Sequence, residues 1–165
     1  MANEFDKVIS EVIKAEGGAR MTNDPDDAGG RTQYGISERN NPQAWLDGKV
    51  TEEEARAIYL QKYVVWPRFN QIPASYALLQ RQMIDFGVVS GPLVAIQKLQ
   101  KVLGVKEDGV LGAKTLTTLV GQDPKSVNNR IVVERLLMNA RICKKDPSQL
   151  RYIEGWNARS VSFYF

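Results

Sequence analysis

The sequence predicts one mainly helical (mainly α) domain over residues 1–165, with a small β-hairpin or irregular loop near residues 19–36. Through most of the chain, apolar residues recur at the three- and four-residue spacing of amphipathic helices. Residues 19–36 instead hold turn formers and short polar side chains without this spacing. A chain of 165 residues is long enough to bury one hydrophobic core without disulfides or metal ions.

The N-terminal third is expected to contain two helices. The first has an apolar stripe made of Phe5, Val8, Ile9, Val12 and Ile13. A pair of glycines ends it. The second lies near residues 52–65, because Thr51 and Glu54 form a capping box and Pro67 cannot continue a helix.

The rest of the chain is expected to be helical as well. Gly87 is expected to end one helix, while Pro92 opens the next and Gly104 closes it. The expected ranges are 76–86, 92–103, 113–120, 125–145 and 148–157.

The chain contains no histidine and one cysteine, Cys143. These counts exclude Ser-His-Asp triads, Cys-His pairs and zinc sites with imidazole ligands. No metal and no other cofactor is expected, and Cys143 is expected to be a buried, unreactive thiol in a helix. If the chain is an enzyme, carboxylates are the leading candidates for its chemistry.

Charge is distributed unevenly along the chain. Residues 1–60 hold seven basic and twelve acidic side chains, net −5, whereas residues 61–165 hold fifteen and seven, net +8. The basic second half fits a polyanionic partner such as nucleic acid, an anionic cell wall or a phospholipid surface. The alternative is a solvated helix face that happens to be basic.

Glu16 is the first candidate for acid chemistry. It follows Val12 and Ile13 by four and three residues, so it extends the buried stripe. It also lies in the last helical turn, where the helix dipole disfavours a carboxylate. Burial and the dipole both favour the protonated form of a carboxyl group, which a general acid for glycosidic cleavage needs. The alternative is an ordinary surface residue before the glycines Gly17 and Gly18, which otherwise let a substrate approach closely.

The loop after this helix contains Asp24, Asp26 and Asp27, followed by Thr32 and Tyr34. Glycoside hydrolysis usually needs a second carboxylate that stabilises the oxocarbenium-like transition state or activates water. The threonine hydroxyl can position that water, and the tyrosine ring can support a sugar. Taken alone, the acidic cluster also fits a turn with Asx hydrogen bonds.

The residues AEGG at 15–18 and NDPDDAGGRTQYGI at 23–36 closely resemble the start of glycoside hydrolase family 108, a family of phage and bacterial muramidases. Ala28 stands where that family usually has proline. The segment DFGVVSG at 85–91 is similar to the family's second block, with Val89 in place of the usual asparagine. A third segment, DGVLGAKT at 108–115, is similar to the signature of small peptidoglycan-binding helical modules. The resemblance covers roughly residues 8–156.

The resemblance implies a lysozyme-like helical fold in which Glu16 is the catalytic acid and Thr32 completes a Glu, Asp, Thr arrangement. The aspartate is Asp27 by its position in the family pattern, or Asp26 by its spacing from Thr32. The substrate-binding candidates are Tyr34, Asp85, Gly17 and Gly18, and a capping or packing role is the alternative for Asp85. Residues 1–90 are then a catalytic portion, and residues 91–160 a peptidoglycan-binding-like portion of the same domain.

The resemblance further implies an N-acetylmuramidase that cleaves the β-1,4 bond between N-acetylmuramic acid and N-acetylglucosamine during phage-induced host lysis. The expected partner is the peptidoglycan glycan strand. The alternatives are a lytic transglycosylase acting on the same polymer and a non-enzymatic wall-binding protein. Retaining and inverting courses stay open, because they depend on the separation of two carboxylates in space.

The expected setting follows from the termini and the charge. The first residues lack the basic start and apolar run of a signal peptide, and no stretch has the length of a membrane span. We therefore expect synthesis in the host bacterial cytoplasm and holin-dependent release to the periplasm or cell wall. A monomer is expected, with the basic half against an anionic outer membrane or wall and no nucleic acid bound. Contact of the helix at 125–145 with membrane stays open.

Overall fold

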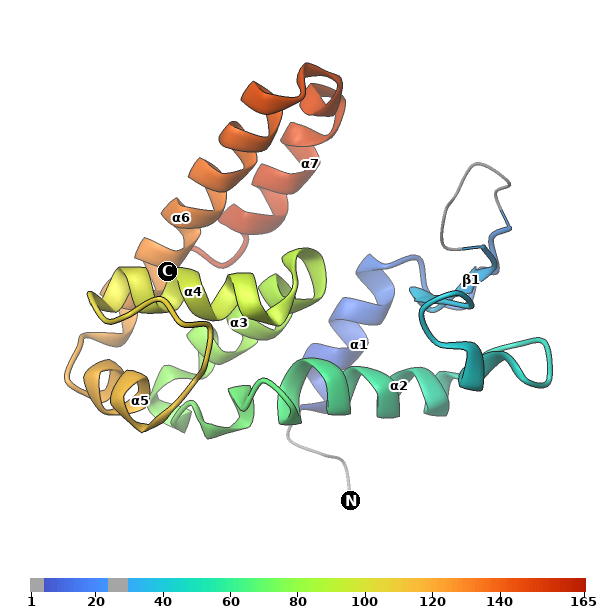
Figure 1. The fold of residues 1–165 in the computed structure, drawn as a ribbon, viewed down its shortest axis with the longest axis horizontal. Helices are drawn as coiled ribbons and strands as arrows, with labels where there is room; N and C mark the ends of the chain where they lie inside the picture. Colours follow the sequence, from blue (N-terminus) through green and yellow to red (C-terminus); the bar gives the residue numbers. More distant parts are fainter. Residues whose placement is uncertain (1–4, 24–29) are drawn as a thin grey trace. The chain divides into compact units, whose positions relative to one another are not determined.

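The structure is a computed structural model that describes residues 5–23 and 30–165 (Figure 1). The described residues are mainly helical, with one two-stranded antiparallel sheet, as the sequence predicts. The elements in chain order are α1 (Asp6–Ala15), β1 (Thr32–Gln33), β2 (Ile36–Ser37), α2 (Glu52–Leu60), α3 (Ala77–Ser90), α4 (Pro92–Leu103), α5 (Ala113–Val120), α6 (Pro124–Lys145) and α7 (Leu150–Val161). They form two compact units, Met1–Trp66 and Pro67–Phe165.

The first unit is built on the packing of α1 against α2. The stripe predicted for α1 is buried from Val8 to Ile13, at 2–5% exposure for its four inner residues. Thr51 caps α2 as predicted: its hydroxyl accepts from the Glu54 amide, and the Glu54 carboxylate accepts from the Thr51 amide. The helix then continues through a π-helical turn, Gln61–Val65, so the helical path spans the predicted range. A hydrogen bond from Arg56 to the Ser10 hydroxyl, 2.7 Å, ties the two helices together.

The second unit is all helical in its regular elements. Helix α3 packs against α4 and α6, and α6 runs beside α7 as a helical hairpin (Figure 1). Its core includes Phe86, Leu99 and Ile131, which are fully buried. Cys143 is buried on α6, as expected. Helices α4 and α5 have the predicted bounds.

Three predicted helix ends are wrong, one on α3 and both on α7. Helix α3 does not stop at Gly87 but runs to Ser90. Gly87 lies inside the helix, and a Cβ there would come 3.1 Å from the Phe69 ring, so the glycine permits close packing rather than ending the helix. The last helix begins at Leu150 because Pro147–Gln149 forms a separate 3₁₀ turn capped by Asp146, and it continues to Val161.

Membrane-spanning helices and metal-binding clusters are both absent from the described residues. None of their helices is long and apolar enough to cross a membrane. Among residues 5–23 and 30–165, no three His, Cys, Asp or Glu side chains gather in a way that could hold a metal ion.

Candidate active site

The candidate acid lies where α1 ends in a Schellman turn. The Gly18 amide donates to the Ile13 carbonyl at 2.9 Å, and the Gly17 amide to the Lys14 carbonyl at 3.3 Å. Both glycines have positive φ, 99° and 60°, which other residues adopt only at a cost. The glycine pair is therefore the local reason that the chain turns immediately after Glu16.

Glu16 itself occupies the cap position of this turn and is exposed. This differs from the expectation that it would extend the buried stripe. The helix ends at Ala15, and the backbone at Glu16 has already left helical geometry, with ψ of 11°. This ψ turns the chain away after Glu16, so no further turn of α1 continues the stripe over the residue, and Glu16 is exposed.

The hairpin between β1 and β2 is packed onto this helix end. Tyr34 and Gly35 form its two-residue turn, both with positive φ, 53° and 74°. The Tyr34 amide donates to the Gly18 carbonyl at 2.9 Å, and the Tyr59 hydroxyl donates to the Tyr34 carbonyl at 3.0 Å. A Cβ on Gly35 would lie 2.8 Å from Cβ of Glu16 and 2.4 Å from the Tyr59 hydroxyl oxygen. The turn therefore touches Glu16 directly, and only glycine fits there.

Thr32 lies in β1 and is half-buried. Its amide and carbonyl pair with Thr22 at 2.9 and 2.8 Å, which joins the strand to the loop that follows α1. The next residue, Gln33, donates through its side-chain amide to the Ala19 carbonyl and accepts from the Val50 amide, at 3.1 and 3.0 Å. The strand that carries Thr32 is thus held by hydrogen bonds to the segment after α1 and to the segment before α2.

The structure thus places Glu16, Gly17, Gly18 and Tyr34 at one place in the first unit. Thr32 stands two residues before Tyr34 in the same hairpin. The remaining acidic candidates of the loop, Asp24, Asp26 and Asp27, lie outside the described residues. Their assignment as the second carboxylate stays a prediction.

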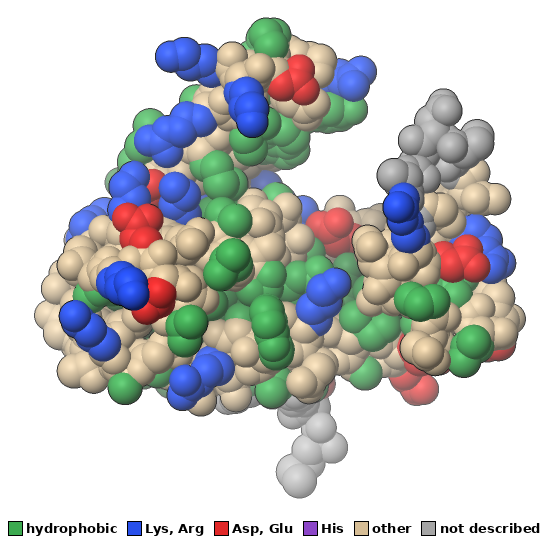
Figure 2. Space-filling model, in the orientation of Figure 1, with side chains coloured by type: hydrophobic (Ala, Val, Ile, Leu, Met, Phe, Trp, Pro, Cys, Tyr) green, Lys and Arg blue, Asp and Glu red, His purple; other side chains and the backbone are tan. Residues whose placement is uncertain are grey.

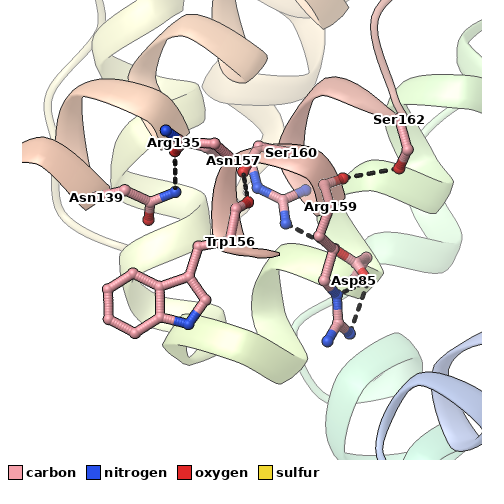
Figure 3. A network of polar contacts seen from close by, with 8 residues as sticks. All are labelled: Asp85, Arg135, Asn139, Trp156, Asn157, Arg159, Ser160 and Ser162. Atoms are coloured by element: carbon pink, nitrogen blue, oxygen red, sulfur yellow. Dashed lines mark hydrogen bonds and ion pairs between the residues drawn. The ribbon is translucent and has the colours of Figure 1, made fainter. Parts of the chain in front are cut away.

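Asp85 lies in the second unit, and its surroundings are structural (Figure 3). Its side chain is 8% exposed, and its oxygens accept from Arg135 at 2.7 Å and from Arg159 at 2.9 Å. Burial lowers the pKa of the Arg135 guanidinium, while Asp85 acts in the opposite direction. This placement supports the packing role that the sequence left as the alternative to substrate binding.

A small polar pocket of about 70 Å³ borders the hairpin in the first unit. It lies between the hairpin, the segment after it and the end of α2. The lining residues are Gly35, Ile36, Ser37, Asn40, Asn41, Ile58, Tyr59, Lys62 and Tyr63. Amide, hydroxyl and ammonium groups line it, but its volume is well below the roughly 300–1,000 Å³ of ligand pockets, so it does not by itself mark a sugar-binding site.

Tyr59 is the site residue that the sequence did not reveal. Its spacing on α2 marks it only as a core residue, and it is 3% exposed. A tyrosine in a buried stripe nevertheless needs a partner for its hydroxyl. The sequence therefore indicates that the Tyr59 hydroxyl has a hydrogen-bond partner. It cannot identify the partner, because the Tyr34 carbonyl reaches Tyr59 only in the tertiary fold.

Chemically, the arrangement offers an exposed carboxyl group on a turn that backbone hydrogen bonds hold in place. The partly exposed Tyr34 ring belongs to the hairpin turn that contacts Glu16. A carboxyl group held in this way can transfer a proton to a bound substrate, as general acid catalysis requires.

Two family models and a solved structure match the chain. The family model described as Glycosyl hydrolase 108 matches residues 9–91, and the model described as Predicted Peptidoglycan domain matches residues 94–161. The solved structure of Brucella abortus SagA is similar, with 29% sequence identity and a TM-score of 0.69, and the match covers 96% of this chain and 94% of that one. A search of curated proteins gave no match.

These matches confirm the lysozyme-like, mainly helical fold with its small hairpin, and they confirm the suspected family with its C-terminal peptidoglycan-binding-like segment. Because the first family model spans half of the chain and contains Glu16 and the hairpin, the chain belongs to the glycosyl hydrolase 108 family and is a glycoside hydrolase that acts on peptidoglycan.

Proposed function

We propose that the protein is an N-acetylmuramidase that hydrolyses the β-1,4 bond between N-acetylmuramic acid and N-acetylglucosamine. The observation that carries this proposal is the exposed Glu16 carboxyl group, held on the Schellman turn and in contact with the hairpin turn. A glycosidase needs such a fixed acid beside a surface that a sugar can reach.

In the proposed reaction, Glu16 protonates the glycosidic oxygen as the bond to the sugar carbon breaks. Asp27 or Asp26 stabilises the positive charge on that carbon or, together with Thr32, directs a water molecule onto it. The water supplies the new hydroxyl group of N-acetylmuramic acid, and its second proton restores the acid. Gly17, Gly18 and the Tyr34 ring border the bound sugar.

The proposed setting is lysis of a bacterial host by a phage-encoded enzyme. The protein would act as a monomer in the periplasm or cell wall after holin-dependent release. The basic residues of its second half, net +8 over residues 61–165, would hold it against an anionic envelope.

The test is the change Glu16→Gln, with Glu11→Gln as the control on an exposed carboxylate of the same helix. We expect Glu16→Gln to slow the release of muropeptides from purified sacculi by about 10²- to 10⁴-fold, because it removes the general acid. Glu11→Gln should keep the wild-type rate. Lysis at the wild-type rate by the Glu16 variant would overturn the assignment of the acid.

The products identify the reaction class. Mass spectrometry of wild-type digests should show reducing N-acetylmuramic acid ends, each carrying the added water. Anhydro-muramic ends would instead establish a lytic transglycosylase. Binding of sacculi without any product would favour the non-enzymatic alternative.

A further inference from the structure

The C-terminal helical pair carries an aromatic surface that the proposed reaction does not use. Residues 94–161 contain two aromatic residues, Tyr152 and Trp156, both on α7. Tyr152 is 46% exposed and Trp156 is half-buried, so neither belongs to the aliphatic core of this segment. Their rings stack with centroids 5.8 Å apart, and Figure 3 shows the indole pointing away from the polar network. Exposed aromatic groups are enriched at binding surfaces.

A glycine lies beside this aromatic pair without a packing reason. Tyr152, Gly155, Trp156 and Arg159 follow the i, i+3, i+4, i+7 spacing and therefore share one face of α7. A Cβ on Gly155 would meet nothing within 4 Å, although glycine inside a helix is destabilising relative to alanine. Gly155 therefore leaves open space on this face between Tyr152 and Arg159, which we call the Gly155 shelf.

The same face ends in a fixed positive charge. Arg159 is 26% exposed in its side chain and contacts the Asp85 carboxylate at 2.9 Å, while Asp85 is shared with Arg135. Two guanidinium groups around one carboxylate carry a net charge of +1. Over residues 124–161 eight basic side chains stand against three acidic ones, and Figure 2 shows Lys and Arg side chains on this helical pair. The exposed ones near the turn are Arg141, Lys144, Lys145 and Arg151.

We propose that this α7 face, formed by Tyr152, Gly155, Trp156 and Arg159, is the surface with which the C-terminal segment holds peptidoglycan. A pyranose ring would rest on the Gly155 shelf against the aromatic pair, and a carboxylate of a stem peptide would pair with Arg159. Peptidoglycan offers both groups within one repeat, apolar faces of sugar rings and anionic peptides. The inference rests on the proposed function for its polymer and adds the place where that polymer is held.

The experiment measures binding of purified sacculi by sedimentation in a Glu16→Gln background, so that digestion does not interfere. Gly155→Leu and Trp156→Ala are each expected to weaken binding at least tenfold. The leucine side chain would fill the Gly155 shelf, and the alanine would remove the indole ring against which the sugar rests. Leu137→Ala is the matched control, since Leu137 is 43% exposed on the neighbouring α6 but outside this face. It should change the affinity less than twofold.

Gly155→Leu also separates binding from folding. Leucine is a better helix former than glycine, and the new side chain starts in open space, so the melting temperature should not fall. Wild-type affinity in both Gly155→Leu and Trp156→Ala would overturn the proposal. So would binding that Lys144→Gln abolishes and high salt removes, or capture by anionic lipid vesicles in place of sacculi, since both indicate charge alone. Failure of the wild-type protein to release muropeptides would count against the proposed function and leave this binding result readable.

Discussion

At the scale of single residues, the site depends on how closely the hairpin turn approaches the helix end. Gly35 contacts both Glu16 and Tyr59, and its φ of 74° is one that glycine adopts without strain. The sequence identified Glu16 by its position at a helix end and left open whether it is buried or at the surface; the structure has it exposed, because the chain turns away from the helix immediately after it. A replacement at position 35 is therefore expected to affect both the stability of the protein and the position of the proposed acid, Glu16.

Gly35→Ala is expected to destabilise the protein by more than the roughly 1–2 kcal/mol that a positive φ costs alanine, because the new methyl group also overlaps Glu16 and Tyr59. Urea unfolding measures the loss. Gly155→Ala is the matched control: position 155 is helical and open, so alanine there should stabilise by up to about 1 kcal/mol. Equal effects of the two changes would contradict the tight contact at Gly35.

At the scale of elements, local signals predicted the helices but not all of their ends. The capping box of Thr51 and the proline at the start of α4 are side-chain and backbone signals that act within one turn, so both helix starts are where the sequence places them. The predicted helix end at Gly87 was wrong because this glycine makes room for the Phe69 ring. That contact is between residues far apart in the sequence, so the local pattern does not predict it. The strands are two residues each, and their pairing depends on the turn at Tyr34 rather than on any apolar alternation.

The hairpin is further held by an ion pair beside its strands. Arg31 binds Glu38 through two hydrogen bonds of 2.7 and 2.9 Å, and its guanidinium lies 5.0 Å from the centre of the Trp45 ring. The hydrogen bond from Arg31 lowers the pKa of the Glu38 carboxyl group. The folded protein therefore favours the charged form of Glu38, which stabilises the hairpin above the usual glutamate pKa.

This stabilisation should disappear as the pH falls through the lowered pKa of Glu38, because the carboxyl group is then protonated in both folded and unfolded states. Glu38→Gln is expected to lower the melting temperature at pH 7 and to have a smaller effect in strong acid. Thermal unfolding of both proteins across this range measures the difference. Glu53→Gln, at an exposed position on α2, is the control. A difference between Glu38→Gln and wild type that does not vary with pH would rule out the ion pair as its cause.

At the scale of the whole molecule, the two segments that match family models have a different boundary from the two compact units of the structure. The family segments meet between residues 91 and 94, whereas the compact units meet between Trp66 and Pro67. Helix α3 therefore belongs to the hydrolase segment by sequence but shares its core with the C-terminal segment. The Asp85 ion pairs with Arg135 and Arg159 join the two segments inside this unit.

Removing this link should be costly. Asp85→Asn is expected to lower the free energy of unfolding by about 3–5 kcal/mol, because it leaves the buried Arg135 without its counter-charge. The double change Asp85→Asn with Arg135→Gln should recover part of the loss, as urea unfolding can measure. For the same reason, a chain cut after Gly91 should fail to fold over residues 67–91. A stable, cooperatively folded 1–91 fragment would show that the hydrolase segment is independent.

The close contact at Gly35 also has a consequence for how tolerance to mutation is read. Under the proposed function, a library screened for lysis alone would rank positions 35 and 16 as equally intolerant, although position 35 is limited by space and position 16 by the proposed acid chemistry. A parallel screen for soluble protein abundance would separate them, since replacements at Gly35 should deplete the protein and replacements at the exposed Glu16 should not. Invariance in this family is therefore informative about catalysis only after the contribution of packing has been subtracted.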